Sequence, residues 1–116
     1  MNLILILEKD RKIAKLIDNS LRKTGRKGYF VANRKRLVEV LKEDLLRFNT
    51  IMINDDKSIN RPELDDYMRT FRRLKYNGKV FFVSDSEDKL GIAKAIGYGG
   101  VYRETIPGIL AYAKAK

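Results

Sequence analysis

Carboxylate, amide and hydroxyl side chains follow three of the apolar runs in this sequence. In chain order the three polar groups are Glu8-Lys9-Asp10, Asn54-Asp55-Asp56 and Ser84-Asp85-Ser86. The runs before them are short and nearly continuous, which is typical of strands covered on both faces of a parallel sheet. In open α/β sheets the ligand crevice lies beyond the carboxyl ends of the strands. We therefore expect the three groups to meet in one acidic pocket that also carries hydroxyls.

The chemistry open to such a pocket is restricted, because the chain contains neither cysteine nor histidine. Without cysteine, no disulfide and no thiolate metal site can form. Without histidine, the usual general base, metal ligand and phosphorelay donor are all missing. No glycine-rich phosphate loop follows the first apolar run either. We therefore do not expect an enzyme, and the pocket is left with carboxylate, amide and hydroxyl groups.

Strand and helix patterns alternate along the whole chain. Strands are expected at residues 2–7, 28–32, 50–54, 79–83 and 101–103, and helices at 11–24, 34–48, 62–75, 87–96 and 107–113. Asp10, Asn33 and Ser86 stand where helix N-caps are expected. The alternation predicts a parallel sheet with helices on both faces, and right-handed crossovers restrict the topology to doubly wound forms. At 116 residues, one domain spanning residues 1–116 is expected.

With these elements placed, the chain resembles the receiver domain of bacterial two-component response regulators over nearly its whole length. The segments that carry the resemblance are residues 3–10, 28–31, 48–54, 80–84 and 95–102. The resemblance implies a CheY-like, flavodoxin-like α/β fold. In that fold a doubly wound five-stranded parallel sheet of the (βα)5 type has the strand order 2-1-3-4-5 and lies in the middle of three α/β/α layers.

Receiver domains use an aspartate nucleophile, two acidic side chains that hold Mg²⁺, a Ser or Thr hydroxyl and a lysine. In this sequence Asn54 stands at the nucleophile position, and only Ser84 matches its expected type. An amide cannot form an acyl phosphate, and a cation beside the first acidic residue opposes a hard divalent ion. The resemblance thus implies a degenerate phosphorylation pocket with no metal site and at most weak Mg²⁺ binding. Its residues are Glu8, Lys9, Asp10, Asn54, Asp55, Ser84 and Glu104.

Asp55 leaves one alternative open, because it follows the nucleophile position directly. Its use as the phosphoacceptor requires a one-residue slip, which turns a strand side chain to the opposite face of the sheet. A bulge can re-aim a strand end in this way. Arg103 replaces the family lysine if the fifth strand also shifts by one residue. An active receiver phosphorylated at Asp55 is therefore one alternative function.

The main interpretation is a phosphorylation-independent pseudo-receiver that serves as a protein-interaction module in signal transduction or regulation. In the receiver family the fourth helix, fifth strand and fifth helix form the output and dimer surface. The corresponding residues are Lys89, Lys94, Tyr98, Tyr102, Arg103 and Tyr112. Aromatic and basic side chains suit an interface with a partner protein or a second copy of the chain. Core packing of the tyrosines is an equal alternative.

The net charge of +10, from 25 Lys and Arg against 15 Asp and Glu, suggests an acidic partner. Non-specific nucleic-acid binding is therefore a second alternative, although solvated helix faces explain the charge as well. The candidate contacts are Arg34, Lys35, Arg36, Arg69, Arg72 and Arg73. No segment approaches the roughly 20 apolar residues of a membrane helix. The first apolar run also lacks the features of a signal peptide, so a cytoplasmic protein without a membrane partner is expected.

Overall fold

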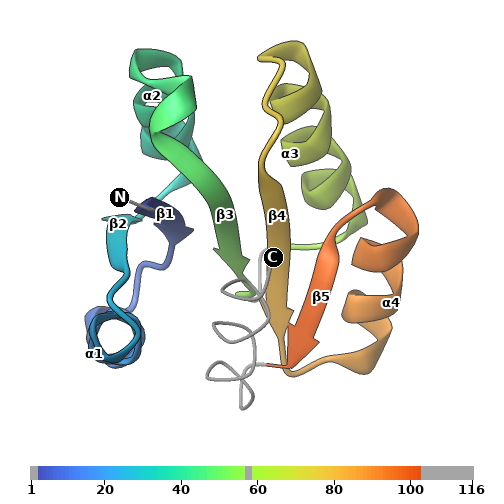
Figure 1. Cartoon of the computed structure of the whole chain (residues 1–116). Coiled ribbons are helices and arrows are strands. Elements are labelled where there is room, and N and C mark those ends of the chain that lie inside the picture. Colours follow the sequence, from blue (N-terminus) through green and yellow to red (C-terminus); the bar gives the residue numbers. More distant parts are fainter. Residues whose placement is uncertain (1–2, 57–58, 103–116) are drawn as a thin grey trace.

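The computed structural model describes residues 3–56 and 59–102 of the chain, in which strands and helices alternate (Figure 1). The strands are β1 (Leu3–Leu7), β2 (Lys27–Val31), β3 (Phe48–Asn54), β4 (Lys79–Ser84) and β5 (Gly99–Tyr102). The helices are α1 (Arg11–Lys23), α2 (Arg34–Glu43), α3 (Arg61–Arg73) and α4 (Glu87–Ile96), and a short 3₁₀ helix, η1 (Leu45–Arg47), lies between α2 and β3. The expected helix at 107–113 lies outside the described residues.

The five strands form one parallel sheet in the order β2-β1-β3-β4-β5. This confirms the predicted doubly wound, flavodoxin-like topology. Leu7 at the end of β1 pairs with Ile53, and Asn54 at the end of β3 pairs with Val83. Because these strand ends are in register, the polar residues that follow them emerge at one edge, which we call the carboxyl edge. The opposite edge, where the strands begin, is the amino edge.

The core lies on both faces of the sheet, because strand side chains alternate between the faces. Leu5, Ile51 and Phe82 pack on one face in a cluster that includes residues of α2, α3 and α4. Ile6 and Met52 pack on the other face with residues of α1. The three-layer arrangement is therefore present, with α1 on one side of the sheet and α2 to α4 on the other.

The second helix is shorter than the sequence pattern predicts. The pattern extends it to Phe48, because Leu37, Leu41, Leu45 and Phe48 continue one apolar stripe. In the structure α2 ends at Glu43, and Phe48 is instead the buried first residue of β3. Phe48 pairs there with β1, and this long-range pairing overrides the local periodicity. The apolar residues of this one stripe therefore lie in a helix, a 3₁₀ helix and a strand in succession.

Three predicted helix caps are confirmed. The side chain of Asp10 accepts a hydrogen bond from the Lys12 backbone N–H at 2.9 Å, and that of Asn33 accepts from the next helix at 2.8 Å. Ser86 accepts from the first turn of α4 at 3.2 Å. The third helix begins at Arg61, one residue earlier than expected. Within the described part of the chain, no helix is long and apolar enough to cross a membrane.

Candidate functional site

The carboxyl edge brings the ends of β3 and β4 together, as the sequence predicts. The backbone N–H of Asp55 donates to the Val83 carbonyl oxygen at 2.7 Å, which continues the strand pairing one residue beyond β3. Asp55 therefore lies beside Ser84, the last residue of β4. Asp55 comes two residues after Ile53, and Ser84 comes two residues after Phe82. Ile53 and Phe82 pack on the face of the sheet that α2 to α4 cover. Because strand side chains alternate between the faces, Asp55 and Ser84 lie on that face too.

Asp55 is the centre of a hydrogen-bonded cluster with Ser84 and Lys89. The Ser84 hydroxyl donates to Asp55 Oδ2 at 2.7 Å, and Lys89 Nζ donates to Asp55 Oδ1 at 3.0 Å. Lys89 also donates to the backbone carbonyl of Asp56 at 3.3 Å. The side chains of Asp55 and Lys89 are only 12% and 29% exposed. Because water screens this ion pair poorly, removing one partner costs more than breaking a surface pair.

Lys89 has a different place from the one the sequence suggests. The resemblance puts it on an outward interaction surface, whereas the structure directs its ammonium to the Asp55 carboxylate. The reason is its position in the first turn of α4, three residues after the Ser86 cap, because that turn starts at the carboxyl edge. One signal in the sequence could have revealed this contact. A lysine in the first turn of a helix lies near the polar end of the strand that precedes the helix.

Asn54 lies on the other side of the sheet from Asp55. It comes two residues after Met52, whose side chain packs on the α1 face, so alternation places Asn54 on that face too. The residue is 3% exposed, and neither its Oδ1 nor its Nδ2 atom has a hydrogen-bond partner. Since buried polar atoms in proteins are almost always paired, the Asn54 amide is an exception at this edge.

The charged residues that follow β1, Glu8 to Asp10, make contacts of their own. Asp10 caps α1, and its backbone N–H donates to Glu8 Oε2 at 3.4 Å. Lys9 Nζ lies 3.1 Å from Asp56 Oδ2, so a cation occupies the space between the β1 and β3 ends. Among the residues that the structure describes, no three Asp, Glu, His or Cys side chains form a group that could hold a metal ion. The described carboxylates therefore do not offer the set of ligands with which receiver domains hold Mg²⁺. Glu104 lies outside the described residues.

A cavity of about 250 Å³ lies where β1 and β3 end, at the point where the strand order reverses. Such reversal points are the usual ligand crevices of open α/β sheets. Two of its lining residues, Lys9 and Asp56, pair with each other, and a third, Arg34, pairs at 3.6 Å with Asp66, which lies outside the lining. Tyr67 forms another wall, and burial raises the pKa of Tyr67 to about 12. The sequence predicts Asp56 at this edge, within the polar group that follows β3, but it does not reveal Tyr67 there.

Tyr98 is a core residue, so its predicted place on an exposed interaction surface is wrong. It is 4% exposed, and its hydroxyl donates to the Leu64 carbonyl oxygen at 2.8 Å. Its ring packs edge-on against Phe82 with 6.2 Å between centroids. The turn after α4 brings the tyrosine against α3, and the alternative of core packing is confirmed for it. Lys94 is exposed on α4.

The structure does not describe the side chains of three other residues of the predicted interaction surface. Tyr102 ends β5, but its side chain lies outside the described residues, as do Arg103 and Tyr112.

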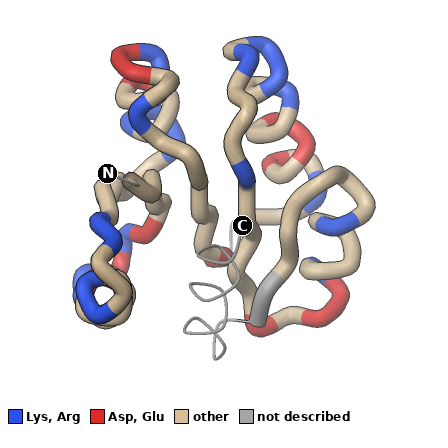
Figure 2. The backbone as a smooth tube through the Cα atoms, viewed as in Figure 1, with Lys and Arg blue, Asp and Glu red and all other residues tan. Residues whose placement is uncertain are grey.

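The two basic groups proposed for nucleic acid lie at opposite edges of the sheet. Arg34, Lys35 and Arg36 open α2 just after β2 ends, whereas Arg69, Arg72 and Arg73 lie toward the end of α3, just before β4 begins (Figure 2). Arg34 also stacks on the Tyr67 ring at 5.1 Å, and Arg36 donates to the Tyr29 hydroxyl at 3.3 Å. The fold therefore does not combine the two groups into one basic surface.

No protein-family model matches the sequence, and no curated protein matches it. Solved structures do match. Chemotaxis protein CheY4 of Vibrio cholerae is 17% identical over 97% of this chain and 98% of its own, with a TM-score of 0.71. The beryllofluoride-activated receiver domain of Klebsiella pneumoniae RstA is 17% identical over 98% and 96%, with a TM-score of 0.76. A de novo designed Rossmann 2x3 protein is 12% identical over 99% and 91%, also with a TM-score of 0.76.

The structural neighbours thus include CheY-like receiver domains of response regulators. A designed protein matches equally well, which shows that this degree of likeness establishes the fold and not the function. Function has to be argued from the site.

Proposed function

We propose that this chain is a receiver-like module of signal transduction that acts by binding a protein partner and does not depend on aspartyl phosphorylation. The observation that carries the proposal is the amide of Asn54 at the end of β3, buried and without a hydrogen-bond partner. A receiver needs a carboxylate there, because the nucleophile must form an acyl phosphate. The receiver-like fold supports the signalling role, and the absence of the nucleophile at this position supports independence from phosphate.

The geometry around Asp55 supports the same conclusion. Both of its carboxylate oxygens already accept hydrogen bonds, from Ser84 and Lys89. Phosphoryl transfer also needs cations that neutralise the phosphoryl oxygens, and in receivers a metal ion does much of this work. The neighbouring acids are engaged elsewhere, Asp56 with Lys9 and Asp10 with the first turn of α1. Asp55 is therefore held as a structural ion-pair partner.

An active receiver that uses Asp55 is the second candidate, and one observation favours it. A carboxylate, a hydroxyl and an ammonium meet at Asp55, Ser84 and Lys89, and these are three of the group types that receiver chemistry uses. In this alternative Lys89 of α4 neutralises the phosphoryl group, a role that the resemblance gives to the position of Glu104.

Phosphorylation by a small donor separates the two candidates. We expect no phosphoryl adduct in the intact mass of the chain after incubation with phosphoramidate and Mg²⁺, under conditions that modify an active receiver domain treated in parallel. The Asn54→Asp variant restores a carboxylate at the end of β3, and an adduct in that variant alone identifies the amide as the block. An adduct on the unmodified chain that Asp55→Ala abolishes overturns the proposal in favour of the second candidate.

A further inference from the structure

The amino edge of the sheet holds most of the positive charge of the chain. Along this edge helices end and the next strands begin, in residues 22–27, 42–49 and 72–79. These three segments contain ten Lys and Arg side chains and two acids, Glu43 and Asp44. The net charge of the whole chain is +10. An excess of eight positive charges therefore lies at this one edge.

The carboxyl edge carries no such excess. Its described segments, where strands end and helices begin, are residues 8–12, 32–36, 55–56, 59–63 and 85–89. They contain eight Lys and Arg side chains and eight acids. Figure 2 shows the contrast, with Lys and Arg gathered at the end of α3 and Asp and Glu along the β4–α4 connection. The positive charge is thus concentrated on one side of the molecule.

Most cations of the amino edge are exposed. Arg22 pairs with Asp18, and Lys79 has another contact. The exposed cations that form no ion pair with a described residue include Lys23, Lys27, Arg47, Arg72, Arg73 and Lys75, which we call the amino-edge cations. Cations stabilise the carboxyl ends of helices, which explains some of them. Lys27, Arg47 and Lys75 lie outside the α-helices, so the helix dipole does not explain these three.

The pairing of the strands brings the amino-edge cations along one side of the sheet. Leu3 at the start of β1 pairs with Lys27 on one side and with Phe48, the residue after Arg47, on the other. The next strand, β4, begins at Lys79 and pairs with β3. Because neighbouring strands lie about 4.8 Å apart, the distance from β2 to β4 is roughly 15 Å. The cations therefore follow an edge of four adjacent strands.

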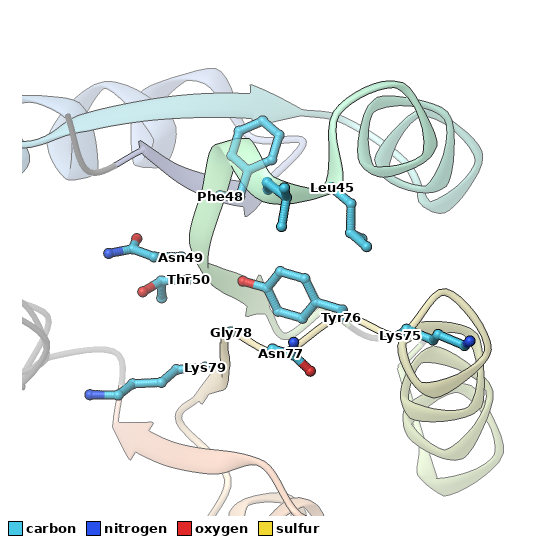
Figure 3. A pocket seen from close by; sticks show the side chains of 10 residues that line it. Leu45, Phe48, Asn49, Thr50, Lys75, Tyr76, Asn77, Gly78 and Lys79 are labelled. Carbon is cyan, nitrogen blue, oxygen red and sulfur yellow. The ribbon is translucent and has the colours of Figure 1, made fainter.

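A pocket of about 410 Å³, which we call the amino-edge pocket, lies between η1, the start of β3 and the turn from α3 into β4 (Figure 3). Its lining includes Lys75 and Lys79 and no carboxylate. The side chain of Lys75 is exposed and points away from the cavity (Figure 3). Lys75 therefore presents its charge on the outer surface of the edge and not inside the pocket.

Arg26 is a second and independent indication of an anion at this edge. It is 9% exposed, and its Nη1 atom is buried without a hydrogen-bond partner. Buried charges in proteins are usually paired, because an unpaired one is costly. Lys27 next to it adds like charge, which increases the cost. An anion bound at the amino edge would supply the negative charge that Arg26 lacks among the described residues.

We propose that the amino edge binds the phosphate backbone of double-stranded nucleic acid without reading its sequence. A duplex carries one negative charge per roughly 1.7 Å of its axis, so an edge of this width meets several phosphates. Within the described residues the edge consists of helix ends, turns and strand starts. It offers no helix or ribbon of strands that could enter a groove and contact bases. This activity goes beyond the proposed function and does not depend on it.

Other partners fit this edge less well. No aromatic side chain that the structure describes is exposed, so the bases of a single strand find no stacking platform. Leu46, 93% exposed, is the only exposed large apolar side chain described at this edge, which leaves little to insert into a membrane. Protein interfaces have cores poor in charge, whereas cations dominate here. A duplex backbone needs only the positive charge that is present.

Fluorescence anisotropy of a labelled DNA duplex of about 20 base pairs, titrated with the full chain, tests this proposal. We expect about four phosphate contacts, so binding should weaken roughly a hundredfold between about 50 mM and about 200 mM salt. A second duplex of unrelated sequence should bind with the same affinity within about twofold, because no base is read.

Two double variants with the same net charge locate the contacts. Lys27→Ala with Arg72→Ala removes two amino-edge cations, and it should weaken duplex binding roughly twentyfold at low salt and reduce the salt slope by about 2. Lys12→Ala with Lys35→Ala removes two exposed cations of the carboxyl edge. It should weaken binding by less than about threefold, because it changes only the overall field. All four side chains are exposed, so both variants are expected to fold.

NMR of the labelled full chain gives an independent readout. On addition of the duplex we expect amide shifts in residues 22–27 and 72–79 and a shift of the Nε–H signal of Arg26. Shifts confined to the carboxyl edge would contradict the proposal.

Three further results overturn it: no duplex binding at about 100 μM chain in low salt, equal losses in the two double variants, or tighter binding of an oligothymidylate or of anionic lipid vesicles than of the duplex. Equal losses would mean that net charge alone attracts the duplex. Failure of the proposed function is a separate outcome, because a phosphoryl adduct on Asp55 would leave binding at the amino edge untouched.

Discussion

At the carboxyl edge of the sheet, charged side chains are matched to one another, whereas at the amino edge the pocket lining carries cations without carboxylates. Asp55 pairs with Lys89 and Asp56 with Lys9, and the Asn54 amide is buried at the end of β3. Around the amino-edge pocket, Leu46 is fully accessible and no carboxylate belongs to the lining. The two edges of one sheet thus differ in how acidic and basic side chains are distributed.

This difference indicates which substitutions should destabilise the chain. Removing one partner of a poorly hydrated ion pair destabilises the fold, because the other charge is left without its partner. The likeness to receivers directs attention to the carboxyl edge, and the internal ion pairs of Asp55 and Asp56 lie there. Changes at the carboxyl edge should therefore alter stability more than changes at the amino edge.

The largest expected effect is a loss of stability in Lys89→Met. It leaves the Asp55 carboxylate, which is 12% exposed, without its ammonium partner. We expect the free energy of unfolding to fall by about 2 kcal/mol, less than for a fully buried pair because Lys89 keeps some contact with water. Urea unfolding measures the change. Lys94→Met, an exposed lysine of the same helix, is the control and should stay within about 0.5 kcal/mol. A loss no larger than that of the control contradicts the pairing.

The next effect is a decline in stability at alkaline pH that depends on Tyr67. Burial raises the pKa of Tyr67 in the folded chain to about 12, whereas the unfolded value is near 10. The contribution of Tyr67 is therefore fully present below pH 10 and is lost as the pH rises toward 12. Between pH 10 and pH 12 the free energy of unfolding, measured with urea, should fall less steeply in Tyr67→Phe than in the unmodified chain, by about 1 kcal/mol per pH unit. This difference is below the limit of about 1.4 kcal/mol per pH unit that the loss of one proton sets. Parallel pH profiles would contradict this.

A gain in stability is expected from Asn54→Val. The substitution replaces a buried amide that has no hydrogen-bond partner by a β-branched apolar side chain suited to a strand. We expect the free energy of unfolding to rise by about 0.5–1 kcal/mol, because an unpaired buried polar group is removed. Thermal and urea unfolding both report it. A clear loss of stability would show that the amide has a partner that holds the strand end.

The smallest effect is expected from Tyr76→Phe at the amino edge. Its hydroxyl is buried and makes no hydrogen bond, so its removal should change stability by less than about 0.5 kcal/mol. Tyr98→Phe is the matched comparison, because the Tyr98 hydroxyl donates to the Leu64 carbonyl at 2.8 Å. That variant should lose about 1 kcal/mol. Equal losses in the two variants would mean that the hydroxyls are equally satisfied.

Local patterns were sufficient to predict much of the fold. The caps at Asp10, Asn33 and Ser86 and the apolar strands depend on neighbouring residues, so the sequence reveals them directly. Phe48 was placed in a helix because its pairing with β1 is a long-range contact that helical spacing does not show. The strand order was expected from the resemblance, and the register of the strand ends then followed.

The candidate sites were harder to predict, because their contacts join distant segments. Lys89 meets Asp55 across 34 positions of the chain, and Tyr98 reaches Leu64 across the same separation. A lysine and a tyrosine on amphipathic segments look equally suited to a surface. The amino-edge pocket was not foreseen at all, since its walls come from two turns whose proximity depends on the completed sheet.

The most direct test of independence from phosphate is an amide NMR spectrum of the labelled chain before and after addition of Mg²⁺ and beryllofluoride, which mimics an aspartyl phosphate. We predict that the signals of Asn54, Ser84 and β5 do not move. Shifts that spread from Asp55 into α4 and β5 would contradict this account, because they would show that the carboxyl edge still binds a phosphoryl group and switches.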